Sequence, residues 1–328
     1  MTPTFAPEAD HTGDPSGKEV IVSTPADTAT RPVSVTRIPN PEEPVPRLSV
    51  PAFVLFLGAL ALWAGSSALA LSHVWLLPVS VPFNALATYL LFTVMHDASH
   101  NSLSSITPVN LWIGRIAAMF FSSLASFRTF RFIHMQHHRF TNDERQDPDD
   151  YASRGPRWQR PARWMTVDLY YIVFYIPKLP GRPRAERVEL AAVWLLVGAL
   201  IAASVLTGHL VELVVLLFLP ARLATLWLGF AFDYLPHNGL KLTASEDRFK
   251  ATRNRVGRES LLSPVLLYQN YHLVHHLHPV VPFHKYIAVW LRNEEDYLAH
   301  EPALSTIRGR PITTDEYRRL RELSHHHH

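Results

Sequence analysis

Apolar residues are gathered in long blocks along this chain, separated by polar stretches. Four blocks approach the length of about 20 mostly apolar residues that a membrane-spanning helix requires. They are residues 51–72, 76–95, 189–207 and 211–232. Only a few residues separate the first block from the second and the third from the fourth, so the pattern predicts two helical hairpins. The expected fold class is an all-α integral membrane protein with four transmembrane helices.

Two further apolar stretches are not expected to cross the membrane. Residues 109–126 include Arg115, and a crossing there would carry His134 to the opposite side from His96. Residues 165–179 combine aromatic side chains with a terminal lysine, which is typical of helices that lie in the interface. Both stretches are therefore predicted to form interfacial or re-entrant helices.

The polar ends of the chain are expected to lie outside the membrane domain. Residues 1–47 are rich in Pro, Thr, Asp and Glu, which predicts a disordered N-terminal tail. The first apolar block begins too far from the N-terminus to be a cleavable signal peptide. One domain is then predicted over residues 48–324, and the histidine run at 325–328 is interpreted as the remnant of a purification tag.

The distribution of basic residues predicts the orientation of the helices. Twelve Lys and Arg residues lie in 128–187 and six in 238–258, whereas the two short hairpin links contain none. The positive-inside rule places the basic stretches, together with both termini, in the cytoplasm. The histidine-rich segments fall on this same side, so we expect a histidine-rich cytoplasmic cap on a protein of the cytoplasmic membrane.

Composition restricts the possible chemistry. The chain contains no cysteine, which excludes disulfides, cysteine-ligated iron–sulfur clusters and a thiolate nucleophile. The net charge of +3 gives no support for nucleic-acid binding. Histidine is abundant, with 19 copies, so a bound metal would have nitrogen and oxygen ligands.

Three histidine clusters follow spacings that suit metal ligation. The first is an HxxxH pattern, and the other two are HxxHH patterns: His96 and His100; His134, His137 and His138; His272, His275 and His276. Positions i, i+3 and i+4 share one side of a helix, so the imidazoles of each cluster can point the same way. Imidazole suits iron, copper, zinc and nickel, and the ligand type alone leaves the metal open. His73, His209, His278 and His284 are expected to pack or to face solvent.

The sequences around these clusters resemble a known superfamily. The series HDASH, HMQHHRFTNDERQDPDD and HLVHHLHP is similar to the membrane fatty-acid desaturase and hydroxylase superfamily, from about residue 50 to about residue 290. Within it, HDASHNS, the acidic DPDD and FDYLPH look closest to the cyanobacterial-type β-carotene hydroxylases. The resemblance implies a catalytic domain with two iron ions and O2 as co-substrate. It also implies His237 as a ninth ligand.

The resemblance gives possible roles to three aspartates. Several relatives have an asparagine where this chain has Asp233, so that side chain could bind the metal directly, bind it through water, or orient His237. The family's DPD pattern favours Asp147 and Asp149 as carboxylates that hold ligand imidazoles. Arg222 lies in the middle of the fourth span, where we expect it either to line a substrate tunnel or to pair with a carboxylate such as Glu189 or Glu212.

An unactivated C–H bond of a lipid requires a metal that activates O2, because acid–base residues cannot attack it. The chain has no dinucleotide motif after a strand and no haem motif, so we expect an external donor such as ferredoxin with its NAD(P)H-dependent reductase. The basic excess in 128–187 suits either an acidic carrier or lipid headgroups. The leading hypothesis is carotenoid β-ring hydroxylation. The alternatives are fatty acyl desaturation or hydroxylation and, from another class, a non-redox zinc-binding membrane protein.

Overall fold

The four long apolar blocks each form a helix that is long and apolar enough to cross a membrane. In the computed structural model, which describes residues 37–325, these spans are Val50–Leu71, Leu77–Ser99, Arg184–Thr207 and Leu210–His237. The first is α1 (Val50–Leu71), the second is mainly α2 (Ser80–Ser99) after the short turn η1 (Leu77–Val79), and the third is α7 (Arg184–Thr207). The predicted all-α membrane fold is confirmed.

The fourth span is not a regular α-helix. It consists of five consecutive turns or helices: α8 (Leu210–Leu213), the π-helical η5 (Val214–Phe218), α9 (Leu219–Leu228), the π-helical η6 (Gly229–Tyr234) and α10 (Leu235–His237). Pro220 has no N–H to donate to the carbonyl of Leu216. That carbonyl instead accepts hydrogen bonds from Trp63 Nε1 at 3.1 Å and Asn84 Nδ2 at 2.9 Å. The interruption therefore connects the fourth span to α1 and α2 through a buried polar contact.

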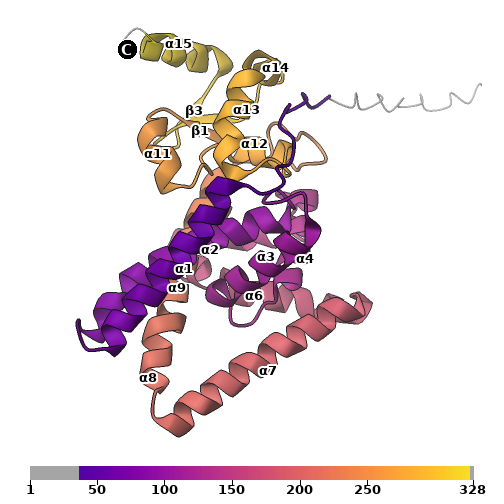
Figure 1. The fold of residues 1–328 in the computed structure, drawn as a ribbon. Coiled ribbons are helices and arrows are strands. Elements are labelled where there is room, and N and C mark those ends of the chain that lie inside the picture. The colour runs from indigo at the N-terminus through magenta and orange to yellow at the C-terminus, as the bar shows by residue number, and fades with distance from the viewer. Residues whose placement is uncertain (1–36, 326–328) are drawn as a thin grey trace, which may run out of the picture. The chain divides into compact units, whose positions relative to one another are not determined.

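Short helices occupy the region between the two hairpins. They are α3 (Thr107–Phe121), α4 (Phe127–Phe140), α5 (Arg160–Met165) and α6 (Val167–Tyr175), with turns η2 (Asp149–Ala152), η3 (Arg157–Gln159) and η4 (Ile176–Gly181). At 15 residues, α3 is too short to cross the membrane. Figure 1 shows α3 and α4 beside α2, and α6 packs on α4. The His134 and His96 rings are accordingly 4.6 Å apart, on one side of the membrane domain.

A small mixed region follows the fourth span. It contains α11 (Glu259–Val265), α12 (His272–Leu277), η7 (Phe283–Lys285), α13 (Tyr286–Arg292), α14 (Glu294–Leu298) and α15 (Thr314–His325). Three short strands, which the sequence pattern did not predict, are β1 (Asn254–Val256), β2 (Leu304–Thr306) and β3 (Pro311–Ile312). In the sheet, β1 runs parallel to β2, with Asn254 opposite Leu304, and β2 runs antiparallel to β3. In Figure 1 this region covers one end of the helices.

The end of the predicted tail contacts the residues on either side of α13. Lys285 Nζ lies 3.1 Å from a Glu43 carboxylate oxygen, and Asn293 Nδ2 donates to the carbonyl of Asn40 at 3.1 Å. The disorder predicted for the rest of the tail, 1–36, lies outside the described residues, as does most of the predicted tag remnant, 326–328.

Arg222 pairs with a carboxylate, as one of the two expectations had it, but the partner is neither Glu189 nor Glu212. Its guanidinium donates to Asp168 on α6, with a distance of 2.7 Å from Nη1 to Oδ1, and to the carbonyl of Met165 at 3.0 Å. Glu189 instead binds Arg115, at 2.6 Å, and Arg128, at 3.1 Å. The polar segment after α4 returns α5 and α6 to the flank of α9, which brings Asp168 within reach of Arg222.

Candidate metal centre

All nine histidines predicted as ligands gather at the ends of four helices. His96 and His100 come from the end of α2, His237 from α10, and the two HxxHH clusters from α4 and α12. Their ligand nitrogens form two groups, each with all atoms within 4.8 Å of one another. The first holds His96, His100, His134, His138 and His275; the second holds His137, His237, His272 and His276.

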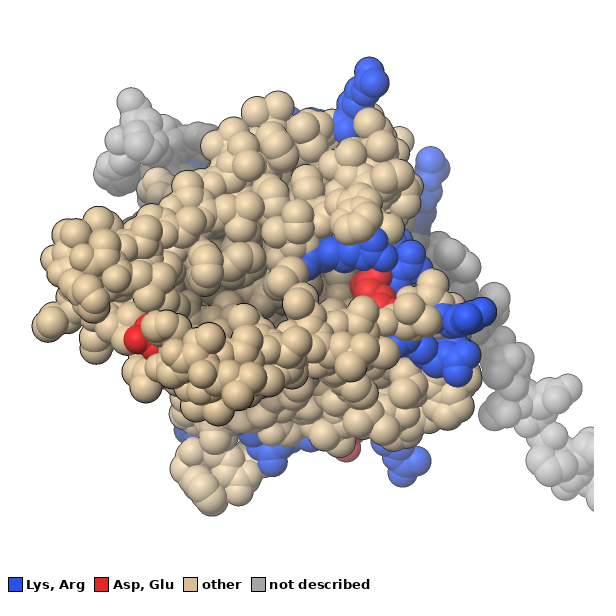
Figure 2. Space-filling model, turned by 60° about the horizontal axis from the view of Figure 1, so that its bottom comes forward, with Lys and Arg blue, Asp and Glu red and all other residues tan. Residues whose placement is uncertain are grey.

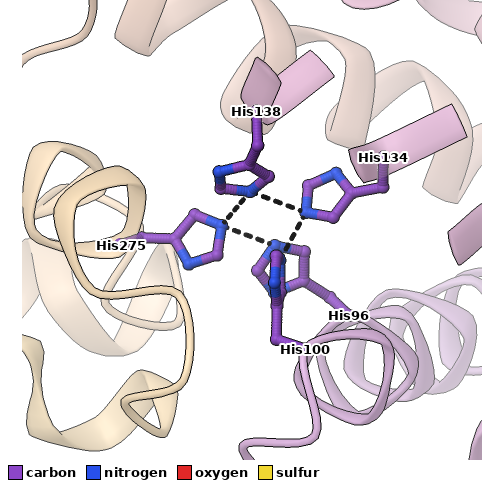
Figure 3. A group of neighbouring side chains, drawn as sticks. All are labelled: His96, His100, His134, His138 and His275. Atoms are coloured by element: carbon purple, nitrogen blue, oxygen red, sulfur yellow. Dashed lines mark hydrogen bonds between the residues drawn. The ribbon is translucent and has the colours of Figure 1, made fainter. Parts of the chain in front are cut away.

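The first group forms a ring of imidazoles whose Nε2 atoms point toward one another (Figure 3). His134 Nε2 lies 2.8 Å from that of His100 and 3.1 Å from that of His138. His275 Nε2 lies 2.9 Å from that of His138 and 3.1 Å from that of His96. Two ligand atoms that each lie about 2.1 Å from one metal ion, with a right angle between their bonds to it, are about 3 Å apart. The distances between these nitrogens therefore suit a shared cation.

The second group has the same character. His276 Nε2 lies 3.2 Å from that of His137 and 3.1 Å from that of His272. The ring of His237 is 4.9 Å from that of His137. The two groups are adjacent, because the rings of His138 and His276 stack with centroids 4.3 Å apart.

Each HxxHH cluster divides between the two groups. Successive helical residues turn by about 100°, so the residues three and four positions after His134 leave the helix about 60° to one side of it and about 40° to the other. His138 accordingly joins His134 in the first group, whereas His137 joins the second. The α12 cluster divides in the opposite sense, with His275 alone in the first group. One helix therefore supplies ligands to two neighbouring positions.

The second ring nitrogens show why these groups suit a metal. His137 Nδ1 lies 2.9 Å from Asp147 Oδ1, and His272 Nδ1 lies 2.7 Å from Gln269 Oε1. An acceptor oxygen at Nδ1 keeps a proton on that nitrogen, so that Nε2 is the nitrogen free to bind a metal ion. His237 Nε2 is also buried, with no hydrogen-bond partner among the described residues. Lone pairs that converge in a buried site repel one another unless a cation lies between them.

Burial keeps most of these imidazoles in the neutral form that binds metals. It lowers the pKa of His134, His138, His272, His275 and His276, and charge on neighbouring histidines lowers it further.

His137 differs from the other ligands because two carboxylates lie beside it. Burial alone would lower the pKa of His137, but Asp149 and Asp147 overcome that effect and raise it to about 9. Asp147 Oδ2 also accepts the backbone N–H of Asn142 at 2.8 Å, and Asp149 Oδ1 accepts the hydroxyl of Tyr171 at 2.7 Å. The two carboxylates are thus positioned to hold the imidazole of His137.

Asp233 is buried in η6, outside both groups of histidine nitrogens. Its charge contributes to the raised pKa of His137.

Comparison with known proteins agrees with this geometry. The sequence profile of the fatty acid desaturase family matches residues 74–308. The chain belongs to this family. It is 28% identical to a beta-carotene ketolase of a Paracoccus strain over 247 residues, which cover 72% of this chain and 90% of the ketolase. It is also 33% identical to an sn-1 oleoyl-lipid 12-desaturase of Arthrospira platensis over 110 residues, 33% of this chain and 30% of the desaturase.

Membership of the fatty acid desaturase family, with relatives of these two kinds, indicates an oxidoreductase of the membrane lipid desaturase and oxygenase type. Its histidine groups could hold metal ions.

Two cavities of this desaturase-family protein differ in character: histidines line the first, and aromatic side chains lie between the second and the histidines. A polar cavity of about 370 Å³ is lined by His137, His237, Asp147 and Asp149, among others. An apolar groove of about 390 Å³ lies between α2, α9 and α11 and is lined by Tyr89. The chemistry of the site thus has a polar side and an apolar side.

An aromatic wall separates the apolar groove from the histidines. The ring of Phe232 lies 6.2 Å from that of Tyr89, 5.2 Å from that of Phe92 and 6.1 Å from that of His96. Phe92 and Phe232 are buried. Water that enters the groove therefore meets a packed aromatic layer before it meets the imidazoles.

Sequence reasoning missed two side chains that contact ligand imidazoles. The hydroxyl of Tyr286 lies 2.9 Å from His275 Nδ1, and Gln269 contacts His272 Nδ1. Gln269 is three residues before His272, and residues three apart share one side of a helix, so this spacing could have indicated it. Tyr286 begins α13, and only the packing of α13 on α12 brings it to His275.

The histidines predicted to lie outside the site do so. His73 and His209 are exposed in the two hairpin links. His278 Nε2 lies 2.7 Å from the hydroxyl of Tyr297, and His284 is half-buried. None of the four belongs to either group of ligand nitrogens.

Proposed function

We propose that this protein is a di-iron, O2-dependent membrane oxygenase that hydroxylates the β-ring of a carotenoid. The observation that carries the proposal is the pair of adjacent imidazole groups, with five and four ligands, beside an apolar groove. A set of nine nitrogen ligands suits two redox-active metal ions better than one structural zinc, which takes four ligands. The long match to a carotenoid ketolase supports a carotenoid substrate.

Iron, when bound, would supply the O2 activation that an unactivated C–H bond requires. The first group, on α2, α4 and α12, would hold one ion, and the second group, on α4, α10 and α12, would hold the other. Asp147, Gln269 and Tyr286 orient three of the imidazoles through their second nitrogens.

The apolar groove would receive the hydrocarbon end of the substrate. Its walls include Leu86, Leu223 and Trp227, together with Tyr89, whose hydroxyl donates to the carbonyl of Val265 at 2.8 Å. Such a lining binds apolar groups without competing polar contacts. Phe232 and Phe92 lie between the groove and His96, so they exclude bulk water and would have to move aside for the substrate to reach the histidines.

The orientation and the electron donor are part of the same proposal. The basic segments support a cytoplasmic location for the histidine cap. The chain lacks cysteine and contains neither a dinucleotide-binding motif after a strand nor a haem motif. An external carrier such as ferredoxin would therefore deliver the electrons. The arginines of 128–187 are suited to an acidic carrier.

The deciding experiment is co-expression with the genes for β-carotene synthesis in a host with intact membranes, followed by pigment analysis. We expect hydroxylated pigments with the wild-type chain and none with His137→Ala. His209→Ala is the matched control, because His209 is exposed in a hairpin link and contacts no ligand. Unchanged pigment with the wild-type chain would overturn the carotenoid proposal.

Fatty acyl desaturation or hydroxylation is the second candidate, because the oleoyl-lipid desaturase also matches this chain. Unchanged pigment together with new double bonds or hydroxyl groups in the host acyl chains would support it. Metal analysis tests both candidates against a zinc protein: about two iron ions per active chain supports an oxygenase, whereas zinc in active protein contradicts it.

A further inference from the structure

A second groove, remote from the histidines, lies between α3 and α7. It has a volume of about 580 Å³ and nearly all of its lining is apolar, including Met119, Val193, Leu196 and Leu200. Figure 2 turns the bottom of the Figure 1 view toward the reader. It shows a hollow with tan walls and a few charged side chains at its edge. The charged residues that line the groove are Arg115 and Glu189.

The groove exists because α7 is attached to α3 and α4 near one of its ends only. Glu189 binds Arg115 and Arg128, and Trp194 Nε1 donates to the carbonyl of Leu124 at 2.8 Å. Beyond these contacts α7 diverges from the other helices (Figure 1), and only 11% of its apolar 18-residue stretch is buried. Within a membrane, the space between α3 and α7 must therefore be filled by apolar chains.

A basic cavity continues the groove toward the histidine cap. This cavity, of about 450 Å³, is lined by Arg128, Arg131 and Arg182 together with Glu186. Phe127 lines both the cavity and the groove, so the two meet at that ring. A single elongated ligand could therefore occupy the basic and the apolar parts together.

The charges around this junction are not balanced. Across the two cavities, Arg115, Arg128, Arg131 and Arg182 face Glu186 and Glu189, which leaves a net charge of +2. Glu189 is shared by two arginines, and Glu186 binds Arg182 at 2.9 Å. Arg115, Arg128 and Arg182 thus have carboxylate partners, whereas no ion pair among the described residues includes Arg131. An anion bound at this junction would balance the excess positive charge.

The length of the groove matches one leaflet of a bilayer. From Val188 to Leu200, α7 rises about 18 Å at 1.5 Å per residue, and half of a hydrocarbon core is about 15 Å. Trp112 is 61% exposed and stacks with Arg115 at 4.7 Å, an arrangement typical of the membrane interface. The basic cavity then lies at headgroup depth and the groove at acyl-chain depth.

We propose that this α3–α7 groove and its basic cavity bind an anionic phospholipid. The acyl chains would lie along α7, and the phosphate would contact Arg131 and Arg128. The site is separate from the apolar groove at α2 and α9, and the inference does not depend on the proposed enzymatic activity.

The test uses phospholipids with brominated acyl chains, which quench nearby tryptophan fluorescence. The full-length chain is reconstituted in phosphatidylcholine vesicles with increasing fractions of brominated phosphatidylglycerol or of brominated phosphatidylcholine. The signal of Trp112 is the difference between the wild-type chain and Trp112→Phe. We expect phosphatidylglycerol to quench at an about fivefold lower fraction, as one unpaired arginine near the membrane would produce.

Arg131→Gln should remove most of this preference and leaves no carboxylate unpaired, whereas Arg131→Lys should retain it. Arg187→Gln is the matched control, because Arg187 is an exposed arginine of α7 that lines neither cavity. If Arg131→Gln fails to reconstitute, the wild-type chain is measured at high salt instead. Salt screens the arginine charges, so the preference for phosphatidylglycerol should then fall. Equal quenching by the two lipids would overturn the proposal. If neither lipid quenches Trp112 and the chain cross-links as a dimer, the groove would instead be assigned to a second copy of the chain.

Discussion

At the scale of single residues, the site depends on what each imidazole contacts through its second nitrogen. His137, His272 and His275 each have an oxygen within 2.9 Å of Nδ1. These contacts select the tautomer whose Nε2 lone pair points into the site. The oxygens come from an aspartate, a glutamine and a tyrosine, so the orienting groups follow no single motif.

Tyr286→Phe tests this dependence by removing only the hydroxyl that contacts His275. We expect metal affinity or activity to fall about 10- to 100-fold, the usual effect of losing a group that orients a ligand. The measurement is iron retention against a competing chelator. Tyr297→Phe is the matched control, because it removes the hydroxyl bound to His278, which is not a ligand. Equal retention in the two variants would contradict the assigned role of Tyr286.

At the scale of elements, the fourth span is tied to its neighbours through polar groups inside apolar surroundings. The carbonyl of Leu216 binds side chains of α1 and α2, and Arg222 on α9 binds Asp168 on α6. Asp168 is 1% exposed. A buried charge of this kind costs little while its partner is present and much when the partner is removed.

Breaking the Arg222–Asp168 pair should therefore destabilise the protein. Arg222→Met alone is expected to cost about 3–5 kcal/mol, because it leaves the Asp168 carboxylate buried and unpaired. Adding Asp168→Asn should recover a large part of that loss. The measurement is thermal unfolding in detergent, and additive losses in the double variant would contradict the pairing. Asp150→Asn, which breaks the more exposed pair with Arg154, is the control and should cost at most about 1 kcal/mol.

At the scale of the whole molecule, the two histidine groups join four segments that are far apart in sequence. The ligands extend from His96 to His276 and come from α2, α4, α10 and α12. Bound metal would therefore cross-link both hairpins and the C-terminal region. Metal that binds the folded chain more tightly than the unfolded chain raises its stability by mass action.

Removal of metal should lower the unfolding temperature of the entire domain. A ligand present at 100 times its dissociation constant contributes about 2.7 kcal/mol, so loss of two ions should shift unfolding by several degrees. The measurement is calorimetric unfolding before and after chelation, followed by restoration with Fe²⁺. An unchanged unfolding temperature would contradict a metal-linked assembly, and restoration by Zn²⁺ of both stability and activity would contradict the iron assignment.

Much of this protein could be predicted from the order of its residues. The apolar blocks predicted four spans because burial in a bilayer requires a minimum length, and Arg115 correctly indicated a segment that does not cross. The histidine spacings predicted eight candidate ligands, which the structure gathers in one region, because helical periodicity is a local property. The resemblance supplied His237, which no spacing would have indicated.

The tertiary structure decided what local periodicity cannot. The division of each HxxHH cluster between two groups depends on where α2, α10 and α12 meet α4, and the partner of Arg222 depends on how α6 returns to α9. Tyr286 reaches His275 only through helix packing. Sequence alone therefore determined the spans, which follow from length, and the eight candidate ligands of the three clusters, which follow from helical repeat, while the resemblance added His237. The fold decided which imidazoles lie together in each group and which side chains contact their second nitrogens, because such contacts depend on the relative placement of distant helices.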